Sequence, residues 1–335
     1  MTKTLEPGKR VGEVTIPSSK SLAHRVLIAS ALSGVEPPAI RGESKDTLAT
    51  RAVLKAMLSG DPVWPCGESG TTLRLLEPIA GVKGFRGEFR LEGRLAERPR
   101  LAFERKSRYV LPGGVSSQFV SGLLMALPLA DWDSEIVVEG GLKSAAYVAL
   151  TESVLTASGI EFSRSGDTWK VRGRQTYRFH QTEAVEGDWS QAAFFLAMGV
   201  KVNGLKSDSL QGDRKIVELI SAIDEGARTL DVDATPDLYP VLAAYAFAKK
   251  RDIAFTGTER LRYKESDRLK STASMLASIS RGEAVDPLGD HRIAMASAIL
   301  SNYWRSPIIV LNAECVEKSY PAFWRDFDSL ERSKL

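Results

Sequence analysis

Several segments place a basic side chain among small polar residues at the start of an apolar stretch. The segment PSSKSLAHR contains Lys20, Ser21 and Arg25, and the mostly apolar stretch of residues 22–32 begins within it. A lysine at the start of a helix opposes the helix dipole, so helix stability does not explain its position. Binding of a phosphate or carboxylate would explain it, whereas a solvent-exposed lysine is the ordinary alternative.

Two further segments of the first half have the same form. GESGTTLR holds Gly70, where the backbone allows an anion to approach, and Arg74 one turn later. This is not a Walker A loop, because the final Lys-Ser/Thr pair is absent. In GGVSSQF, Ser116, Ser117 and Gln118 precede a very apolar segment and suit a hydroxylated or phosphorylated ligand. A helix cap followed by a turn explains these three residues equally well.

Acidic residues join the basic ones in the second half. RLRYKESDRLK predicts a helix on which Lys264 and Arg268 share one face, with Glu265 beside Lys264. A solvated charged helix is the usual interpretation of such a run. Asp237, in TPDLYPVL, stands at a predicted helix start, where capping is the ordinary role.

Three more segments carry residues of the same chemical types. In DHRIAM we expect Asp290 to cap a helix while His291 and Arg292 project from its first turn. Arg98 precedes a proline, which favours an extended or turn segment. Lys318, in VEKSYPAFW, lies between a predicted strand and a predicted helix. Taken singly, each of these side chains is more often structural or solvated than catalytic.

Helix starts are the elements that must bring these residues together. Six small polar clusters each precede an apolar segment of helical character, at intervals of about fifty residues except across the middle of the chain. The clusters are PSSKS, CGESGTT, GGVSSQ, EGDWSQ, ATPDL and GDHR. Short β-like runs bounded by turn residues lie between them. The sequence therefore predicts six related α/β units.

Composition limits the class of protein. The 335 residues are 43% hydrophobic and 26% charged, as in a globular protein of one large or two ordinary domains. With 45 Lys plus Arg against 42 Asp plus Glu, the balance argues against a nucleic-acid or membrane-surface protein. Two cysteines and three histidines lack metal-ligand spacing, so we expect no metal. No apolar run reaches the length of a membrane span, and we expect a cytoplasmic protein.

Nine motifs in order resemble those of the 5-enolpyruvylshikimate-3-phosphate (EPSP) synthase family, from about residue 17 to residue 325. They are PSSKSLAHR, CGESGTTLR, ERP, VSSQFVSGLLMALPLA, EGDWSQAAFFLA, PDLYPVLAAYAFA, YKESDRL, DHRIAMA and KSYPAFW. The resemblance implies the two-domain, inside-out α/β fold of the enolpyruvyl transferases, built from six βαβαββ units. It implies one domain of residues 1–17 and 187–335, a second of residues 18–186, and an active site in the cleft between them.

The resemblance also implies an activity. Members of the family transfer the enolpyruvyl group of phosphoenolpyruvate to the 5-hydroxyl of shikimate-3-phosphate and release phosphate, a step of aromatic amino acid biosynthesis by the shikimate pathway. The reaction is an addition followed by an elimination, through a tetrahedral intermediate, and needs no cofactor. We expect a monomer whose partners are these two substrates. Gly70 matches the glycine that leaves room for the inhibitor glyphosate, and Leu75 stands where many relatives carry proline.

Roles of individual residues follow from the same resemblance. Lys20 resembles the lysine that bridges both substrates, and Asp237 the carboxylate on the 5-hydroxyl. Glu265 resembles the acid that protonates the methylene carbon, with His291 alongside, so we expect burial to raise the pKa of Glu265 against the effect of nearby cations. The residues expected to bind shikimate-3-phosphate are Lys20, Ser21, Arg25, Ser116, Ser117, Gln118, Ser144, Tyr147, Asp237 and Lys264. Those expected to bind phosphoenolpyruvate are Lys20, Gly70, Arg74, Arg98, Gln118, Arg268, Arg292 and Lys318.

The chain departs from the family pattern in length and in single residues. The third unit, between ERP and VSSQ, and the sixth, before DHR, are expected to be trimmed, and Arg260 stands where the family usually has Asn. One alternative is the sister enzyme that acts on UDP-N-acetylglucosamine. That enzyme normally has Asn after the first catalytic lysine, whereas this chain has Ser21. It also has a reactive cysteine in a loop of its first half, whereas Cys66 lies in a different motif. A second alternative is a non-catalytic, anion-binding paralogue.

Overall fold

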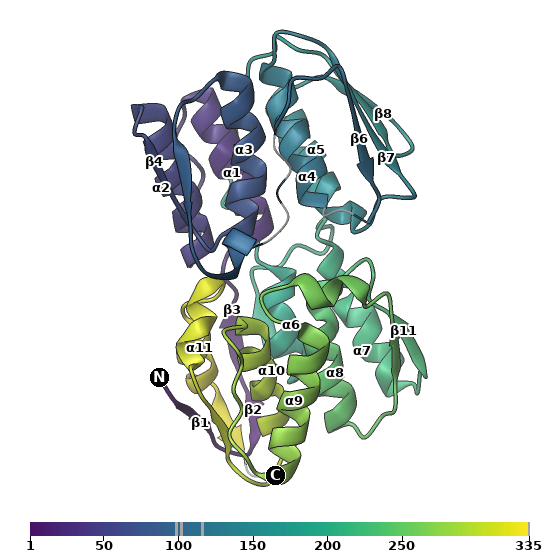
Figure 1. Ribbon diagram of the computed structural model, residues 1–335. Coiled ribbons are helices and arrows are strands. Elements are labelled where there is room, and N and C mark those ends of the chain that lie inside the picture. The colour runs from purple at the N-terminus through teal and green to yellow at the C-terminus, as the bar shows by residue number, and fades with distance from the viewer. Residues whose placement is uncertain (98–99, 101–102, 115–116, 334–335) are drawn as a thin grey trace. The chain divides into compact units, whose positions relative to one another are not determined.

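The computed structural model describes residues 1–97, 100, 103–114 and 117–333 (Figure 1). The chain folds into two compact units: unit 1 comprises Met1–Ser19 and Glu186–Leu335, and unit 2 comprises Lys20–Val185. Each unit has a hydrophobic core of its own. Within the described ranges, no helix is long and apolar enough to cross a bilayer.

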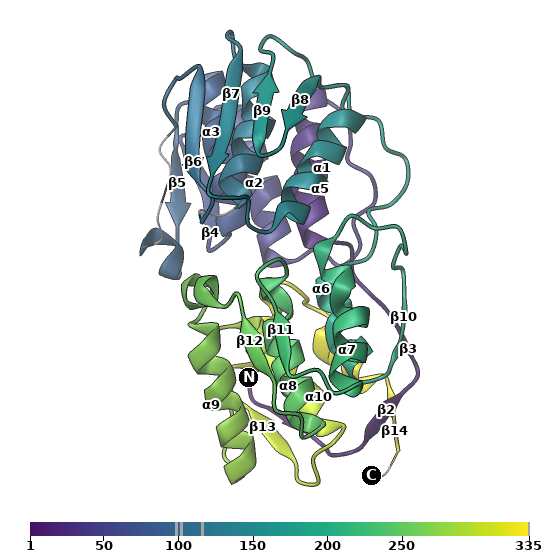
Figure 2. The same ribbon diagram turned by 90° about the vertical axis from the view of Figure 1, so that its right-hand side faces the viewer.

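Unit 2 contains one complete βαβαββ arrangement and one shorter βαβ arrangement. Its elements are α1 (Lys20–Ser33), α2 (Lys45–Ser59), β4 (Val63–Gly67), α3 (Gly70–Lys83), β5 (Glu88–Leu91), β6 (Arg108–Pro112), α4 (Ser117–Ala126), β7 (Ser134–Glu139), α5 (Ala145–Ala157), β8 (Phe162–Ser165) and β9 (Thr168–Val171). Strands β6 and β7 are parallel, and β9 runs antiparallel to both β7 and β8, which gives the four-stranded sheet of Figure 2. Strands β4 and β5, which precede and follow α3 in the chain, pair in parallel.

Close packing of α3 on α4 prepares part of the site. All residues of α4 except Gln118 are buried, as expected for a helix that is apolar on every face. A Cβ atom at Gly122 would lie 2.1 Å from the carbonyl oxygen of Arg74, so only glycine permits this approach. The two helices therefore carry the side chains at their N-terminal ends within reach of each other.

Unit 1 is built on short strands and a buried central helix. Its strands are β1 (Lys3–Leu5), β2 (Lys9–Val11), β3 (Glu13–Thr15), β10 (Lys201–Asn203), β11 (Thr229–Asp231), β12 (Ala254–Thr256), β13 (Ile308–Val310) and β14 (Glu331–Ser333). Its helices are α6 (Trp189–Ala197), α7 (Ile216–Asp224), α8 (Tyr239–Ala248), α9 (Arg268–Arg281), α10 (His291–Ser301) and α11 (Phe323–Asp328). The strands form four two-stranded sheets, β1–β13, β10–β3, β11–β12 and β14–β2.

The N-terminal segment belongs to unit 1 because its strands pair there. Strand β3 runs parallel to β10, and β1 runs antiparallel to β13. Leu5, Val14 and Ile16 are buried in the unit 1 core. Every residue of α10 is buried, including His291 and Arg292 in its first turn, and its charged side chains are confined to that turn.

Most of the predicted helices are confirmed, with one correction. The six expected apolar segments correspond to α1, α3, α4, α6, α8 and α10. The prediction that Lys264 and Arg268 share a helix face is wrong. Asp267 caps α9 by accepting a hydrogen bond from the Lys270 amide, so the helix begins at Arg268 and leaves Lys264 in an extended conformation.

The sheets differ in size. We expected the third and sixth units to be trimmed; over the described ranges one sheet has four strands, β6–β7–β9–β8, and the other five have two. The links between elements are short, such as the three residues that join α2 to β4.

Candidate active site

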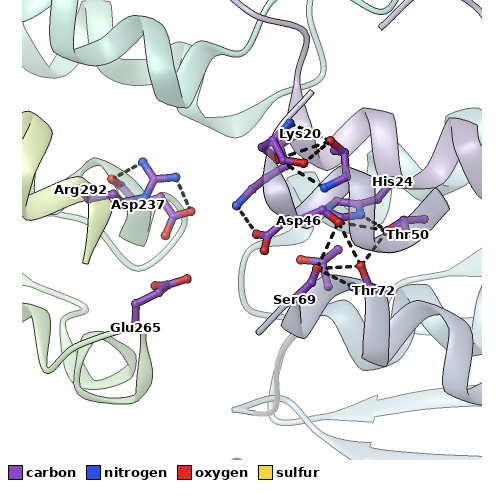
Figure 3. Close-up of polar contacts among 12 residues, drawn as sticks. Lys20, His24, Asp46, Thr50, Ser69, Thr72, Asp237, Glu265 and Arg292 are labelled. Carbon is purple, nitrogen blue, oxygen red and sulfur yellow. Dashed lines mark hydrogen bonds and ion pairs between the residues drawn. The ribbon is translucent and has the colours of Figure 1, made fainter. Parts of the chain in front are cut away.

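Each unit contains one cluster of candidate site residues, and the cluster of unit 2 surrounds Lys20. Lys20 is the first residue of α1, and its Nζ lies 2.9 Å from Oδ2 of Asp46 in the first turn of α2 (Figure 3). Their side chains are 18% and 9% exposed, so the pair is shielded but still accessible from solvent. An ammonium held in this way is placed to contact an anion.

A chain of hydroxyl groups lies beside Asp46. Thr72 Oγ1 and Ser69 Oγ lie 3.3 and 3.5 Å from the Asp46 carbonyl oxygen, and 2.7 Å from each other. Thr72 Oγ1 is also 2.7 Å from Thr50 Oγ1, which is 2.6 Å from Nδ1 of His24 (Figure 3). Burial, with smaller effects from nearby cations, holds the pKa of His24 well below its usual value. The imidazole is therefore neutral at neutral pH.

Arg74 and Gln118 meet where α3 and α4 begin. One guanidinium nitrogen of Arg74 donates to Oε1 of Gln118 at 2.6 Å, and Nε2 of Gln118 donates to Oγ1 of Thr71 at 2.8 Å. The guanidinium carbon also lies 5.3 Å from the centre of the Phe119 ring. Gly70 is the first residue of α3, on the same turn as Thr71.

Arg25 lies inside unit 2, with only 1% of its surface exposed. Its guanidinium donates to the hydroxyl groups of Thr151 and Ser121 and to the carbonyl oxygens of Ser21 and Tyr147. Burial lowers the pKa of Arg25 to about 10, which still leaves it charged at neutral pH. Arg25 thus fixes α1 to α5 and holds the backbone of two expected substrate-binding residues, Ser21 and Tyr147.

The remaining expected residues of unit 2 lie in different surroundings. Ser144, the residue before α5, is buried and has a φ of 53°, an uncommon conformation for a residue other than glycine. Ser117 is buried at the first position of α4. Arg98 and Ser116 lie outside the described residues.

The second cluster, in unit 1, is centred on Asp237. Its Oδ1 lies 3.1 Å from Lys264 Nζ and 2.7 Å from a nitrogen of Arg268, and its Oδ2 lies 2.9 Å from a nitrogen of Arg292. Arg292 also donates to the Asp237 carbonyl oxygen (Figure 3). The expected capping role of Asp237 is not seen, because its carboxylate is occupied by three cations. Lys264 and Arg268 do converge, but on this carboxylate and not along a helix.

Arg268 ties Asp237 to two other carboxylates. It donates to Oε2 of Glu265 at 2.6 Å and to Oδ2 of Asp290 at 2.9 Å, and only 1% of its side chain is exposed. Asp290 caps α10 as expected, accepting from the Arg292 amide at 3.0 Å. Glu265 is 19% exposed, so its carboxylate is accessible from solvent whereas that of Asp290 is not.

The charge state of Glu265 differs from the expectation. Burial raises the pKa of Glu265, but four groups around it outweigh burial and hold the pKa well below its usual value. In decreasing order of effect these are Arg268, His291, Lys264 and Lys318. The expectation of a raised pKa is therefore wrong, because the groups around the Glu265 carboxylate stabilise its charged form more than burial destabilises it.

A second buried acid in unit 1 behaves in the opposite way. Burial raises the pKa of Asp213 to about 7, with further contributions from the negative charges of Asp237 and Asp188. Asp237 itself has its pKa held well below the usual value, since Arg292, Lys264 and Arg268 together outweigh its burial. Two neighbouring carboxyl groups thus have pKa values pushed in opposite directions.

Sequence reasoning missed three participants. Asp46 is the partner of Lys20, but it looked like an ordinary first-turn acid in SKDT. Thr72 follows directly on the noted glycines, and its hydroxyl was not singled out. Asp213, in QGDR, lies in a 3₁₀ turn that carried no recognised motif. Of these three residues, only Asp46 is an acid in the first turn of an α-helix capped by a small polar side chain, that of Ser44, where a sequence pattern could have singled it out.

Groups that could hold a metal are not found in the part of the chain that the structure describes. Cys66 is buried, and burial raises the pKa of its thiol to about 12. Its Sγ donates to the Ser69 carbonyl oxygen. The thiolate form needed for nucleophilic chemistry is therefore disfavoured at this position.

Comparisons with known proteins identify the family of the chain. The family model described as EPSP synthase (3-phosphoshikimate 1-carboxyvinyltransferase) matches residues 104–281 and 277–327. A 3-phosphoshikimate 1-carboxyvinyltransferase of Clostridium kluyveri is 35% identical over 98% of this chain and 96% of its own length. One of Clostridium novyi is 32% identical over 97% and 96%. The first alignment spans 414 positions against 335 residues here, so the relative has internal segments that this chain lacks.

Solved structures show the same fold. An EPSP synthase from Acinetobacter baumannii, at 20% identity, superposes with a TM-score of 0.75 over 99% of this chain and 100% of that chain. A second structure of EPSP synthase from that organism gives a TM-score of 0.72 over the whole of both chains. The predicted fold class, that of the enolpyruvyl transferases, is confirmed. The chain belongs to the EPSP synthase (3-phosphoshikimate 1-carboxyvinyltransferase) family.

Proposed function

We propose that this protein transfers the enolpyruvyl group of phosphoenolpyruvate to the 5-hydroxyl of shikimate-3-phosphate and releases phosphate. The observation that carries the proposal is the unit 1 cluster, where Asp237 and Glu265 are both held by Arg268. A reaction that adds an alcohol across a double bond needs one group to accept a proton and another to supply one. Family membership identifies the substrates.

The chemistry assigns a separate task to each carboxyl group. Asp237 accepts the proton of the 5-hydroxyl as its oxygen bonds to carbon 2 of phosphoenolpyruvate, and Glu265 protonates carbon 3. In the second step carbon 3 returns a proton, the bond from carbon 2 to the phosphate oxygen breaks, and phosphate leaves. Lys20 assists the departing phosphate, because its ammonium donates to an oxygen that gains negative charge.

Substrate binding must change the charge state of Glu265. In the free protein four groups hold its pKa well below the usual value. The carboxylate and phosphate of phosphoenolpyruvate bring negative charges to the same cations, which removes part of their effect on Glu265. We propose that binding thereby raises the pKa of Glu265 and lets it carry the proton that carbon 3 needs.

Substrate recognition is proposed to use residues of both units. The hydroxyl, amide and cationic groups of unit 2 suit the phosphate and hydroxyl groups of shikimate-3-phosphate: Lys20, Ser21, Arg25, Ser116, Ser117, Gln118, Ser144 and Tyr147, with Asp237 and Lys264 of unit 1. The cations and Gly70 suit phosphoenolpyruvate: Lys20, Gly70, Arg74, Arg98, Gln118, Arg268, Arg292 and Lys318. We propose that the active site lies in the cleft between the domains of residues 1–17 with 187–335 and residues 18–186, as in the family.

The two alternatives are less well supported. Enolpyruvyl transfer to UDP-N-acetylglucosamine would call for a reactive cysteine, whereas burial raises the pKa of Cys66 to about 12. A non-catalytic paralogue would not need Glu265 beside Arg268 and near Lys318. The cytoplasmic location, the monomeric state and the sensitivity to glyphosate stay predictions from the sequence.

Phosphate release tests the proposal. The purified protein is mixed with phosphoenolpyruvate and shikimate-3-phosphate, and inorganic phosphate is measured with time. We expect one phosphate for each shikimate-3-phosphate consumed, and none when that substrate is omitted or replaced by UDP-N-acetylglucosamine. Phosphate release with the nucleotide sugar alone would favour the sister activity, and no release with either would favour the paralogue.

A further inference from the structure

A closed loop of polar contacts braces the first turns of α1. It runs from Lys20 to the Asp46 carboxylate, and from the Asp46 carbonyl oxygen through the hydroxyl groups of Thr72 and Thr50 to His24. His24 stands four residues after Lys20 on the same helix, so the loop returns to the turn where it began (Figure 3). Its members come from three helices, α1, α2 and α3.

We propose that His24, Thr50 and Thr72 are positioning residues that act through Asp46 to fix the ammonium of Lys20. The inference rests on the proposed function, because it concerns the lysine that assists phosphate departure. His24 and the two threonines are fully buried, so the proposal assigns them no direct contact with a substrate. Their effect is to hold the peptide of Asp46, whose carboxylate lies 2.9 Å from Lys20 Nζ.

The direction of the hydrogen bonds follows from burial. His24 is fully buried, and its Nε2 has no hydrogen-bond partner among the described residues. In proteins a buried N–H without an acceptor is rarer than a buried acceptor without a donor. The unpartnered Nε2 is therefore assigned as the unprotonated nitrogen, and the proton of the neutral ring lies on Nδ1. Nδ1 then donates to Thr50, Thr50 donates to Thr72, and Thr72 donates to the Asp46 carbonyl oxygen. Each hydroxyl group gives its single proton once, so the chain is internally consistent.

Stability alone does not account for this network. Replacing a buried pair of hydrogen-bonded groups by apolar groups of the same shape is often neutral or stabilising. Yet Thr50 and Thr72 are both 0% exposed, where valine would have the same shape and no polar atom to satisfy. A positional role explains why threonine occupies these positions, because hydrogen bonds are directional whereas apolar contacts are not. The geometry fixed here is that of Asp46 and Lys20.

The test is a double-mutant cycle on turnover. Thr72→Val and Thr50→Val are each made in the unaltered protein and in Asp46→Asn, and kcat and both KM values are measured by phosphate release. We expect each valine variant to lower kcat by about tenfold in the unaltered protein and by less than about twofold with Asp46→Asn. Both KM values should change by less than about threefold, because the buried threonines are proposed to act through Asp46 and not on the substrates.

Controls separate positioning from folding. Thr72→Ser restores the hydroxyl group and should keep kcat within about twofold of the unaltered value. Ser30→Ala removes a buried hydroxyl group of α1 that has no hydrogen-bond partner in the described ranges, and it should leave kcat and both KM values unchanged. Melting temperatures show whether each variant is folded, and Thr50→Val carries the test if Thr72→Val does not fold.

The possible results are distinct. Equal losses of kcat in both backgrounds, or no loss in either, would overturn the inference, since the threonines would then not act through Asp46. Loss confined to the background with Asp46 intact would support it. Absence of phosphate release by the unaltered protein would reject the proposed function, and the inference with it.

Discussion

The buried arginines of the two units have opposite surroundings. In unit 1, Lys264, Arg268 and Arg292 share the Asp237 carboxylate, and Arg268 binds two further carboxylates. In unit 2, the buried Arg25 donates to hydroxyl groups and carbonyl oxygens, all of them neutral. The unit 1 cluster is thus an ion-pair network, whereas the charge of Arg25 is held by neutral partners.

The difference indicates a division of labour. The positive charge of Arg25 is not neutralised by an ion pair, which suits the proposed binding of a phosphate group by unit 2. In unit 1 the charges nearly cancel, and a substrate must compete with carboxylates for each cation. That competition couples the binding of an anion to the protonation state of Asp237 and Glu265, which suits a site for proton transfer. Exchanging residues within each cluster tests this contrast.

The largest effect is expected from Asp237→Asn in unit 1. The asparagine has nearly the same shape but cannot accept the hydroxyl proton, and it leaves three cations without their shared carboxylate. We expect kcat to fall by about a thousandfold, within the range found for loss of a general base. The measurement is phosphate release under saturating substrates.

A matched control accompanies Asp237→Asn. Asp328→Asn removes an exposed partner of Lys3 and should change kcat by less than about twofold, because an exposed ion pair contributes little. A loss of less than about tenfold for Asp237→Asn would remove this residue from the proton-transfer step.

Glu265→Gln should have the next largest effect. Without the acid, carbon 3 is not protonated, so we expect kcat to fall by about a hundredfold or more while both KM values stay within about threefold. In deuterated water the unaltered protein should exchange deuterium into the methylene group of phosphoenolpyruvate when shikimate-3-phosphate is present. Near-normal turnover, or unchanged exchange in Glu265→Gln, would assign the acid role to another group.

Arg74→Lys in unit 2 should weaken binding more than turnover. Lysine keeps the charge but loses the planar fork that holds Gln118, so the amide is no longer oriented. We expect the KM for phosphoenolpyruvate to rise by about tenfold with kcat within about threefold. Arg90→Lys, at an exposed arginine, should change neither. A large fall in kcat with an unchanged KM would show that unit 2 takes part in the chemical steps beyond binding.

The smallest effect concerns stability and pH. The pKa of Asp213 is raised to about 7 in the folded protein, against 3.8 as its ordinary value, so folding favours its protonated form. The contribution of Asp213 to the free energy of unfolding is at its maximum below about pH 4 and is lost as the pH rises toward 7. Asp213→Asn has the shape of the protonated acid and does not ionise. The difference between its melting temperature and that of the unaltered protein should grow in favour of the variant from about pH 4 to 7. Above pH 7 this difference should stay constant. A difference that does not vary with pH would contradict the raised pKa.

The sequence predicted which residues form the two clusters better than it predicted how those residues are arranged. Lys20, Asp237, Glu265 and Arg268 were identified because their motifs resemble a known family, and all four lie in one cluster or the other. The helix starts followed from small polar residues before apolar segments, which is a local signal. The cap at Asp267, which separates Lys264 from α9, is equally local, but the continuous run of charged residues concealed it.

Properties that depend on several segments were out of reach. The Asp46 partner of Lys20 comes from a different helix, and no spacing rule links residues 20 and 46. The pKa of Glu265 depends on the balance between burial and four groups around it, and a sequence does not give that balance. The pairing of strands into small sheets joins segments far apart in the chain, such as β1 with β13, and no local pattern predicts it.

Identification of the products tests the central claim most directly. Phosphorus NMR of the unaltered protein with equimolar phosphoenolpyruvate and shikimate-3-phosphate follows both phosphates at once, and mass spectrometry gives the mass of the organic product. The account predicts inorganic phosphate and an enolpyruvyl ether of shikimate-3-phosphate in equal amounts, with neither formed by Glu265→Gln over the same time. Persistence of both substrates with the unaltered, folded protein would contradict it.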